Sequence, residues 1–468
     1  MGNMNATTAV LSLPSNVTSR SSSTRWLLGQ IETGRGTAGT RSGVYEVAFV
    51  TSLMAVQCAL LHPTFQFSRS ARLARLAAGP LLVGWWLCFP FRLPVQPFET
   101  RSILPAFLAG TMALKSIEWT FVAGPYHMRT LKIIHGVPWW MKEPPPEPSP
   151  SDNKPGWSEL ALWTILQFNS QRGFRWSWGP ASKGNQKSFL EALLELARLQ
   201  AVMLPCLAFV LHSQDWTTHD FDSRRVFLDL GVPCFPGLKY VASVSHSVCA
   251  MLALSNSIEI ISLIPVLCTY LVHPISEKAG LPETLSALVD PRNFPAQFAP
   301  LFGFSSLAHF WGNTWHQKLR RHFLFCGGKP AIALARSLGG SPRIQKASGT
   351  LAVILLSGLF HEYLMYGLQR TPHPHPRELF KTFPGSLLFF AVQPLGLALE
   401  PMLATRIPKS LGGAKVWAAC FLLLTAPLFT SDVCRPGGMF NQYRMPHEWT
   451  WLHFLIPAPF AARLLPHT

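Results

Sequence analysis

The stretch "LAVILLSGLFHEYLMYGL", residues 351–368, is apolar over most of its length, and His361 and Glu362 interrupt it. A helix that crosses the hydrocarbon core of a bilayer needs roughly 20 predominantly apolar residues. Ionisable residues inside such a helix are rare, and they usually face a protein interior or a water-filled cavity. This stretch therefore predicts a membrane-spanning helix whose two ionisable residues face away from lipid.

His361 is expected to lie deep in this helix. The 13 residues from Ser348, at the edge of the span, to His361 (361 − 348) correspond to roughly 20 Å of helix, which is beyond the midplane of a hydrocarbon core about 30 Å thick. Ser357 and Gly358 lie one turn before His361, and their small size would leave space beside the imidazole. Two interpretations stay open at this point: a functional histidine, or a buried structural one.

The composition of the whole chain indicates a polytopic membrane protein. Of its 468 residues 48% are hydrophobic and 13% are charged, whereas an average soluble domain has about 25% charged residues. Apolar runs recur along the chain, and each should be helical because lipid offers the backbone no hydrogen-bond partner. We therefore expect an all-α fold with about eight to ten transmembrane helices. The candidate runs are 43–61, 76–91, 103–123, 197–212, 239–254, 257–272, 347–366, 384–402, 413–430 and 449–465. Several of them carry a charge inside or at the edge, among them Glu46, Lys115, Glu118, Glu259 and Glu362.

The formal net charge of +17 comes mostly from bases between the apolar runs. No zinc pattern, basic helix repeat or aromatic RNA-binding signature accompanies these bases, so nucleic acid is not an expected partner. Residues 318–346 contain seven Lys and Arg and no Asp or Glu, which predicts a cytosolic location by the positive-inside rule. The nine cysteines form no CxxC pair and are typical of small buried hydrophobes, and no metal site is predicted.

The chain is expected to form one membrane-embedded domain, residues 43–468, after a disordered polar tail, residues 1–42, that is rich in Ser, Thr and Arg. Residues 142–156, "KEPPPEPSPSDNKPG", predict a surface loop because proline at that density cannot continue a helix. No internal repeat of fixed period is present.

A second polar stretch, "SSLAHFWGNTWHQKLRRHF", covers residues 305–323. Its spacing predicts one helix with a polar stripe that ends in basic residues. The stripe could be the solvated face of an interfacial helix with tryptophan anchors, or it could be the wall of an active site. The polar face would hold His309, Asn313, His316 and Arg320, and another face would hold Phe310, Trp311, Trp315 and Leu319.

The two stretches together resemble the plant wax synthase family and its fungal relatives, within the wider class of membrane-bound O-acyltransferases. The resemblance rests on "QRGFRWSWG" (171–179), "NFPAQFAPLFGFSSLAHFWGNTWH" (293–316) and "SGLFHEY" (357–363). It covers roughly residues 170–366, with the catalytic core at 295–366. The resemblance implies a helical bundle with a central tunnel, in which an acyl group passes from a coenzyme A thioester to a hydroxyl.

The resemblance also implies a role for each site residue. His361 would be the general base that takes the hydroxyl proton. His316, or Asn313 one turn earlier, would be its polar partner and could donate a hydrogen bond to the oxyanion. The bases implied to bind the donor's phosphates are Lys318, Arg320 and Arg321, and the side chains implied to line the tunnel are Trp311, Trp315, Ser357, Gly358 and Glu362.

The resemblance implies acyl-CoA as a co-substrate, a lipophilic alcohol that enters from the bilayer, and no bound cofactor. Plant members make wax esters, whereas similar fungal proteins acetylate terpenoids and related secondary metabolites. The basic tail and the Pro-rich loop look more like the fungal type, which favours acetyl-CoA, a terpenoid-like acceptor and a multi-pass protein of the endoplasmic reticulum. Two alternatives stay open: a wax or sterol ester synthase that uses fatty acyl-CoA, and a non-catalytic transporter, although a transporter should show inverted repeats.

Overall fold

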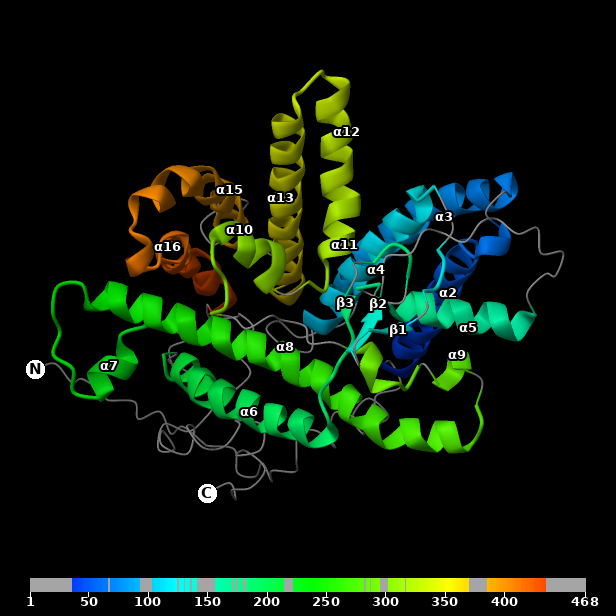
Figure 1. Cartoon of the computed structure of the whole chain (residues 1–468), viewed down its shortest axis with the longest axis horizontal. Helices are drawn as coiled ribbons and strands as arrows, with labels where there is room; N and C mark the ends of the chain where they lie inside the picture. Colours follow the sequence, from blue (N-terminus) through cyan, green and yellow to red (C-terminus); the bar gives the residue numbers. More distant parts are fainter. Residues whose placement is uncertain are drawn as a thin grey trace, which may run out of the picture. The chain divides into compact units, whose positions relative to one another are not determined.

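The computed structural model confirms the all-α class, with one small antiparallel sheet in addition to the helices (Figure 1). The sheet consists of β1 (Leu131–Ile134), β2 (Val137–Trp140) and β3 (Ser182–Lys183). The structure describes residues 36–65, 68–92, 103–123, 126–129, 131–134, 137–140, 156–170, 172–173, 176–179, 182–213, 222–281, 283–286, 288–294, 302–315, 317–369 and 385–434.

The described residues form long helices joined by short helical turns. The long helices are α2 (Gly36–Ala59), α3 (Arg69–Arg92), α4 (Ile103–Phe121), α5 (Trp157–Asn169), α6 (Phe189–His212), α8 (Leu238–Lys278), α12 (Lys329–Ser337), α13 (Pro342–Gln369), α15 (Gly385–Leu403) and α16 (Ala414–Cys434). The short elements are η1 (Pro63–Phe65), α7 (Arg225–Asp229), α9 (Glu283–Ser286), η3 (Pro291–Asn293), α10 (Leu307–His309), η4 (Phe310–Thr314), α11 (Arg320–Phe323), η5 (Leu324–Gly328), η6 (Ala404–Arg406) and η7 (Lys409–Leu411).

The chain divides into two compact units, residues 1–52 and 53–468, and the candidate site lies within the second. Helix α2 begins at Gly36, inside the predicted tail, while residues 1–35 and the loop at 142–156, apart from Gly156, lie outside the described residues.

Among the described residues, five helices are long and apolar enough to cross a membrane: α3, α6, α8, α13 and α15. Two shorter apolar helical segments, Tyr45–Ala59 and Ala414–Thr430, add to them. This confirms a polytopic helical protein. The total of eight to ten spans stays a prediction, since the candidate run at 449–465 lies outside the described residues.

One pair of predicted spans is wrong. The runs 239–254 and 257–272 are parts of a single helix, α8, which has 41 residues and is therefore about 60 Å long. Ser255 and Ser257, where the two runs meet, lie within the helix, and their hydroxyls bond back to the carbonyls of Leu252 and Ala253.

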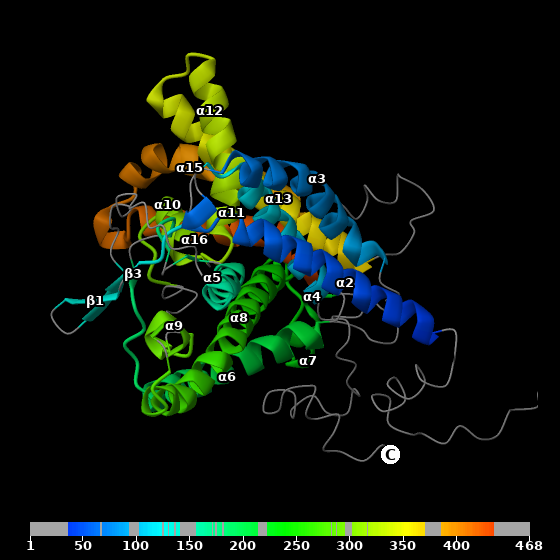
Figure 2. The same cartoon turned by 90° about the vertical axis from the view of Figure 1, so that its right-hand side faces the viewer.

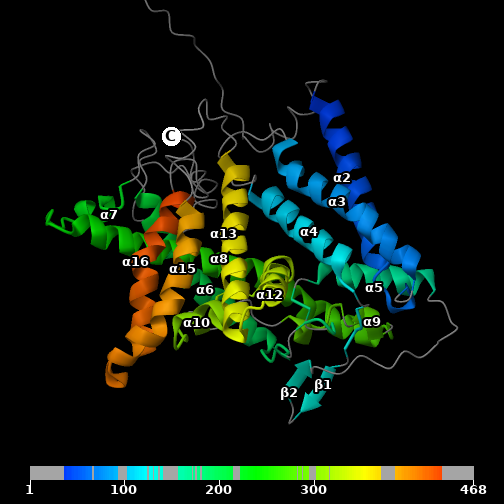
Figure 3. The same cartoon turned by 90° about the horizontal axis from the view of Figure 1, so that it is seen from above.

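Glycines bring α15 close to its neighbours, so that it packs against both α13 and α16 (Figures 2 and 3). A Cβ on Gly358 of α13 would lie 2.9 Å from Leu387 Cδ1 and 3.0 Å from Phe390 Cβ of α15. A Cβ on Gly396 of α15 would lie 2.4 Å from Phe421 Cε1 of α16. The space beside Gly358 is therefore filled by α15, and this close packing positions the aromatic rings described below.

Gly79 and Gly84 of α3 offer a matched test of helix packing. A Cβ on Gly79 would lie 2.2 Å from Thr120 Oγ1 of α4, whereas nothing lies within 4 Å of a Cβ on Gly84. We expect Gly79→Ala to lower the free energy of unfolding by about 1–3 kcal/mol through overpacking. Gly84→Ala should leave the free energy of unfolding unchanged or slightly higher, because alanine favours a helix over glycine. Thermal unfolding of both purified variants checks this, and equal midpoints would contradict the α3–α4 contact.

Candidate active site

His361 lies on α13 among aromatic rings. Its imidazole stacks on Phe390 of α15, with ring centroids 4.7 Å apart, and meets Phe429 of α16 edge-on at 5.5 Å. The Nδ1 atom lies 2.7 Å from the carbonyl oxygen of Ser357. Because a carbonyl oxygen can only accept, Nδ1 is the protonated nitrogen, and Nε2 is the basic nitrogen of the neutral ring. Helix α13 itself thus fixes the tautomer that a general base needs.

The rings beside His361 belong to an apolar cluster. Phe389, Phe390 and Phe429 are buried there together with side chains from several helices. Such a setting suits a lipophilic substrate, since ligand sites are mostly apolar with a few placed polar groups. The other buried members of the cluster are Val210 and Leu211 of α6, Ala250 of α8, and Ile354 and Met365 of α13.

The prediction of one helix over residues 305–323 is wrong. After α10 the chain forms a π-helical turn, η4, and its backbone becomes extended at Trp315 (φ −65°, ψ 153°). The N–H of Trp315 bonds to the carbonyl of Phe310 at 2.9 Å, five residues back, and α11 begins only at Arg320. A π-turn is wider than an α-turn, so the predicted common face of polar residues does not form.

The π-turn directs Trp311 toward α15. The indole Nε1–H donates to Gln393 Oε1 at 3.2 Å, and the Trp311 ring lies 5.6 Å from that of Phe390. Phe390 therefore contacts both Trp311 and His361. The structure brings the two predicted motifs together through this one ring.

Glu400 binds the start of the segment that contains the π-turn, next to the N-cap Ser306. Its Oε1 accepts a hydrogen bond from the N–H of Leu307, and its Oε2 accepts one from the N–H of Ala308 at 3.2 Å. The first N–H groups of a helical segment have no acceptor within it, so a side chain must supply one. Glu400 and Gln393 were not among the predicted site residues. The signal that could have found them is that both interrupt the apolar run at 384–402.

Glu362 has a similar role at the other end of α15. Its Oε1 accepts a hydrogen bond from the N–H of Leu387 at 2.7 Å, in the first turn of that helix, and the side chain is buried. The contact holds the start of α15 against α13. A role for Glu362 or Gly358 in lining a tunnel stays a prediction.

Arg321 forms a buried ion pair. Its Nε donates to Glu118 Oε1 of α4 at 2.8 Å, and its guanidinium lies 5.2 Å from the ring of Trp178 in the "QRGFRWSWG" element. The hydroxyl of Tyr126 also donates to Glu118 Oε1, and His322 Nδ1 lies 3.3 Å from Glu118 Oε2. Burial opposes the charge of Arg321, but the Glu118 carboxylate outweighs it and raises the pKa of the guanidinium. Burial, aided by Glu118, also raises the pKa of Tyr126 well above its ordinary value.

The other two predicted donor-binding bases differ in exposure. Arg320 is exposed and bonds to Gln317 at 3.2 Å. Lys318 lies over the ring of Phe107 at 5.8 Å, and burial lowers its pKa. Phe323, which follows them, meets Phe360 at 5.7 Å. The segment that carries these bases therefore packs on Phe360 of α13, the residue before His361.

Of the two predicted partners of His361, the structure describes one. Asn313 lies in the π-turn with an exposed side chain, and His316 lies outside the described residues. Trp315 is buried and packs 5.8 Å from Phe310. In the described part of the chain, no group of three or more His, Cys, Asp or Glu is arranged to hold a metal ion.

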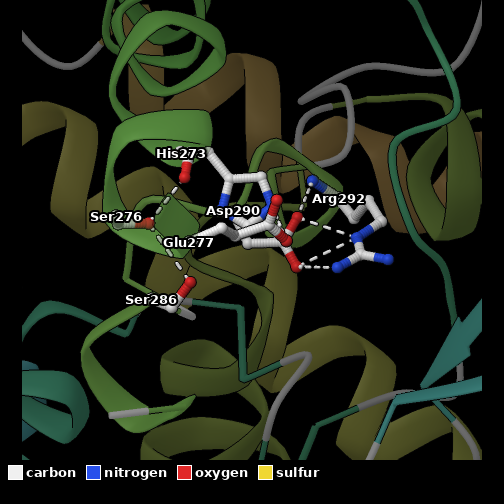
Figure 4. Close-up of polar contacts among 6 residues, drawn as sticks. All are labelled: His273, Ser276, Glu277, Ser286, Asp290 and Arg292. Atoms are coloured by element: carbon white, nitrogen blue, oxygen red, sulfur yellow. Dashed lines mark hydrogen bonds and ion pairs between the residues drawn. The ribbon is translucent and has the colours of Figure 1, made fainter. Parts of the chain in front are cut away.

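A second polar cluster lies at the C-terminal end of α8 (Figure 4). Asp290 is buried and accepts hydrogen bonds from the backbone N–H and the guanidinium of Arg292, each at 2.9 Å. Ser276 of α8 lies 3.2 Å from Ser286 of α9, between the two hydroxyl oxygens. The contact of Ser276 with Ser286 joins α9 to α8, whereas the contacts of Asp290 with Arg292 cap the start of η3.

Substitution of Glu362 tests the start of α15. Glu362→Leu removes the acceptor of the Leu387 N–H, and we expect the free energy of unfolding to fall by about 0.5–2 kcal/mol, the usual effect of losing a helix cap. Glu362→Gln keeps an acceptor oxygen and should be milder. Thermal unfolding of the two purified variants measures the difference. An equal loss in both would show that the carboxylate charge, and not the hydrogen bond, is what matters.

No curated protein matches the chain. Residues 294–392, from the end of η3 to the middle of α15, match the Membrane bound O-acyl transferase family. The matched range contains η4, the bases of α11 and His361 of α13. Together with the membrane-spanning helices, this match supports a membrane-bound O-acyltransferase.

Proposed function

We propose that the protein transfers an acetyl group from acetyl-CoA to a hydroxyl of a lipophilic, terpenoid-like secondary metabolite, in the membrane of the endoplasmic reticulum. The observation that carries acyl transfer is His361: its tautomer is set by the Ser357 carbonyl and its ring is surrounded by aromatic side chains, within the segment that matches the O-acyltransferases. The acetyl group and the acceptor class rest on the resemblance to fungal acetyltransferases.

The proposed reaction uses the unprotonated ring nitrogen of His361, Nε2. Nε2 of His361 takes the hydroxyl proton while the oxygen attacks the thioester carbonyl. The new C–O bond forms a tetrahedral intermediate, whose oxyanion needs hydrogen-bond donors, and we propose His316 or Asn313 for this role. The C–S bond then breaks, and the proton on Nε2 passes to the departing coenzyme A sulfur. One ester and one thiol result, and the imidazole returns to its neutral form.

The acceptor class fits the surroundings of His361. Four aromatic side chains, Trp311, Phe389, Phe390 and Phe429, lie close to the imidazole or to one another. Aromatic faces offer a large apolar area to a rigid, polycyclic alcohol.

A transfer assay tests the donor and the acceptor together. Membranes that contain the full-length chain are incubated with labelled acetyl-CoA or palmitoyl-CoA and a panel of polycyclic, sterol and long-chain alcohols. We expect acetyl esters of polycyclic alcohols. Palmitoyl esters alone would make the protein a wax or sterol ester synthase, and no transfer with any pair would overturn acyl transfer. In the same assay His361→Ala should lower kcat by about 10² to 10⁴, the range for general base catalysis.

His273→Gln is the matched control for His361→Ala. His273 lies near the far end of α8, 3.4 Å from Glu277, and we expect its substitution to leave kcat unchanged. If His361→Ala kept more than about a tenth of the wild-type rate, the assignment of the general base would be wrong.

Arg320 and Arg321 should respond differently to substitution. Arg320→Glu changes an exposed charge and should raise the KM for the donor while the KM for the alcohol stays constant, because uniform binding of the phosphates is lost. Arg321→Leu leaves Glu118 buried without its cation, and should lower the free energy of unfolding by about 3–5 kcal/mol.

The double variant Glu118→Leu/Arg321→Leu is the control for the ion pair. It should recover much of the lost stability, since removal of both charges of a buried pair is far less costly than removal of one. Thermal midpoints and the KM values for donor and alcohol show whether Arg321 acts on stability or on donor binding. A raised donor KM in a stable Arg321→Leu protein would instead place Arg321 at the donor.

A further inference from the structure

We propose that Glu400 is a positioning residue for the reaction: it holds the π-turn η4 so that Trp311 stays against Phe390 and, through that ring, keeps the imidazole of His361 in place. This inference rests on the proposed function. Glu400 lies beyond the segment that matches the O-acyltransferase family, which ends at residue 392.

Both carboxylate oxygens of Glu400 are used in this contact. One accepts from the N–H of Leu307 and the other from the N–H of Ala308, while the side chain is only 8% exposed. A buried carboxylate is costly unless hydrogen bonds satisfy it, and buried N–H groups are costly without an acceptor. Both costs are lowest when the segment begins at this position, so Glu400 holds its start, together with the N-cap Ser306, whose hydroxyl accepts from the N–H of His309.

One face of α15 receives the whole segment. Gln393, Gly396 and Glu400 are spaced i, i+3 and i+7, which places them on the same side of the helix. A Cβ on Gly396 would lie 2.8 Å from Leu307 Cδ2, so the glycine admits the first residue of α10. Gln393 accepts from the indole of Trp311. Glu400 thus binds the start of the segment, Gly396 leaves room for the side chain of Leu307, and Gln393 binds the indole of Trp311.

The position of Trp311 depends on that start. Each residue turns a helix by about 100°, so a shift of one residue would move the indole away from α15. The Trp311 ring lies 5.6 Å from Phe390, and Phe390 stacks on His361 at 4.7 Å. A displaced indole would remove one of the contacts that hold Phe390, and would so loosen the ring on which the imidazole stacks. Misplacement of a catalytic group by about 1 Å can cost 10²-fold in rate.

The experiment compares four variants of the full-length protein in the transfer assay. Glu400→Leu removes the acceptors, Glu400→Gln keeps one, Trp311→Phe removes the indole N–H, and Glu400→Leu/Trp311→Phe combines the two losses. Asp290→Leu is the matched control, because Asp290 is also a buried carboxylate that accepts from a backbone N–H at the start of a short helix, η3 (Figure 4). Rates are expressed per amount of folded protein, and thermal midpoints are measured in parallel.

We expect Glu400→Leu to lower kcat about 10- to 100-fold with little change in the donor KM, and Glu400→Gln to recover most of the rate. The double variant should be no slower than Glu400→Leu alone, because both substitutions act on the same contact. Asp290→Leu should lower the thermal midpoint and leave kcat per folded protein unchanged.

Three results would overturn the inference: an unchanged kcat in folded Glu400→Leu, additive losses in the double variant, or an equal loss of kcat in Asp290→Leu. A wild-type chain without any transferase activity would overturn the proposed function first. The thermal midpoints need no substrate, so they would then still show whether Glu400 and Trp311 act through one contact.

Discussion

The first N–H groups of a helix have no acceptor within it, and the candidate site depends on two contacts of this kind, one at each end of α15. At its first turn, Leu387 donates to Glu362 of α13, and near its last turn Glu400 accepts from the start of α10. These two contacts join α13 and the π-turn segment to a single helix. The motifs that contain His316 and His361 are 45 residues apart in the chain (361 − 316), and α15 is what connects their helices in space.

The catalytic potential of His361 follows from the same packing. A helical histidine whose Nδ1–H bonds to its own helix needs no second side chain to fix its tautomer. The glycine at 358 lets α15 approach closely enough for Phe390 to stack on the imidazole. Apolar rings then surround an imidazole that is oriented by the backbone, an arrangement that suits the proton transfer we propose.

The basic segment combines two kinds of cation. A buried ion pair stabilises a fold only when other hydrogen bonds satisfy the carboxylate, and Glu118 accepts one from the hydroxyl of Tyr126. Arg321 therefore anchors α11 to α4, whereas Arg320 beside it is exposed. Adjacent bases thus have a structural and a solvent-facing position, although both count equally toward the charge of the segment.

Much of this protein is determined by local sequence, because hydrophobicity and charge act residue by residue. Long apolar runs specify an all-α membrane fold, and an ionisable residue inside such a run marks His361 and Glu362. Other features depend on contacts between residues that are distant in the sequence, so only the tertiary structure determines them. The periodicity of residues 305–323 assumes 3.6 residues per turn, but Glu400, 93 residues from Leu307, binds the start of the segment, and the bond from Trp315 to Phe310 widens it into a π-turn. The ion pair of Arg321 with Glu118, 203 residues away, is likewise invisible to spacing, since no local pattern encodes which helices will be neighbours.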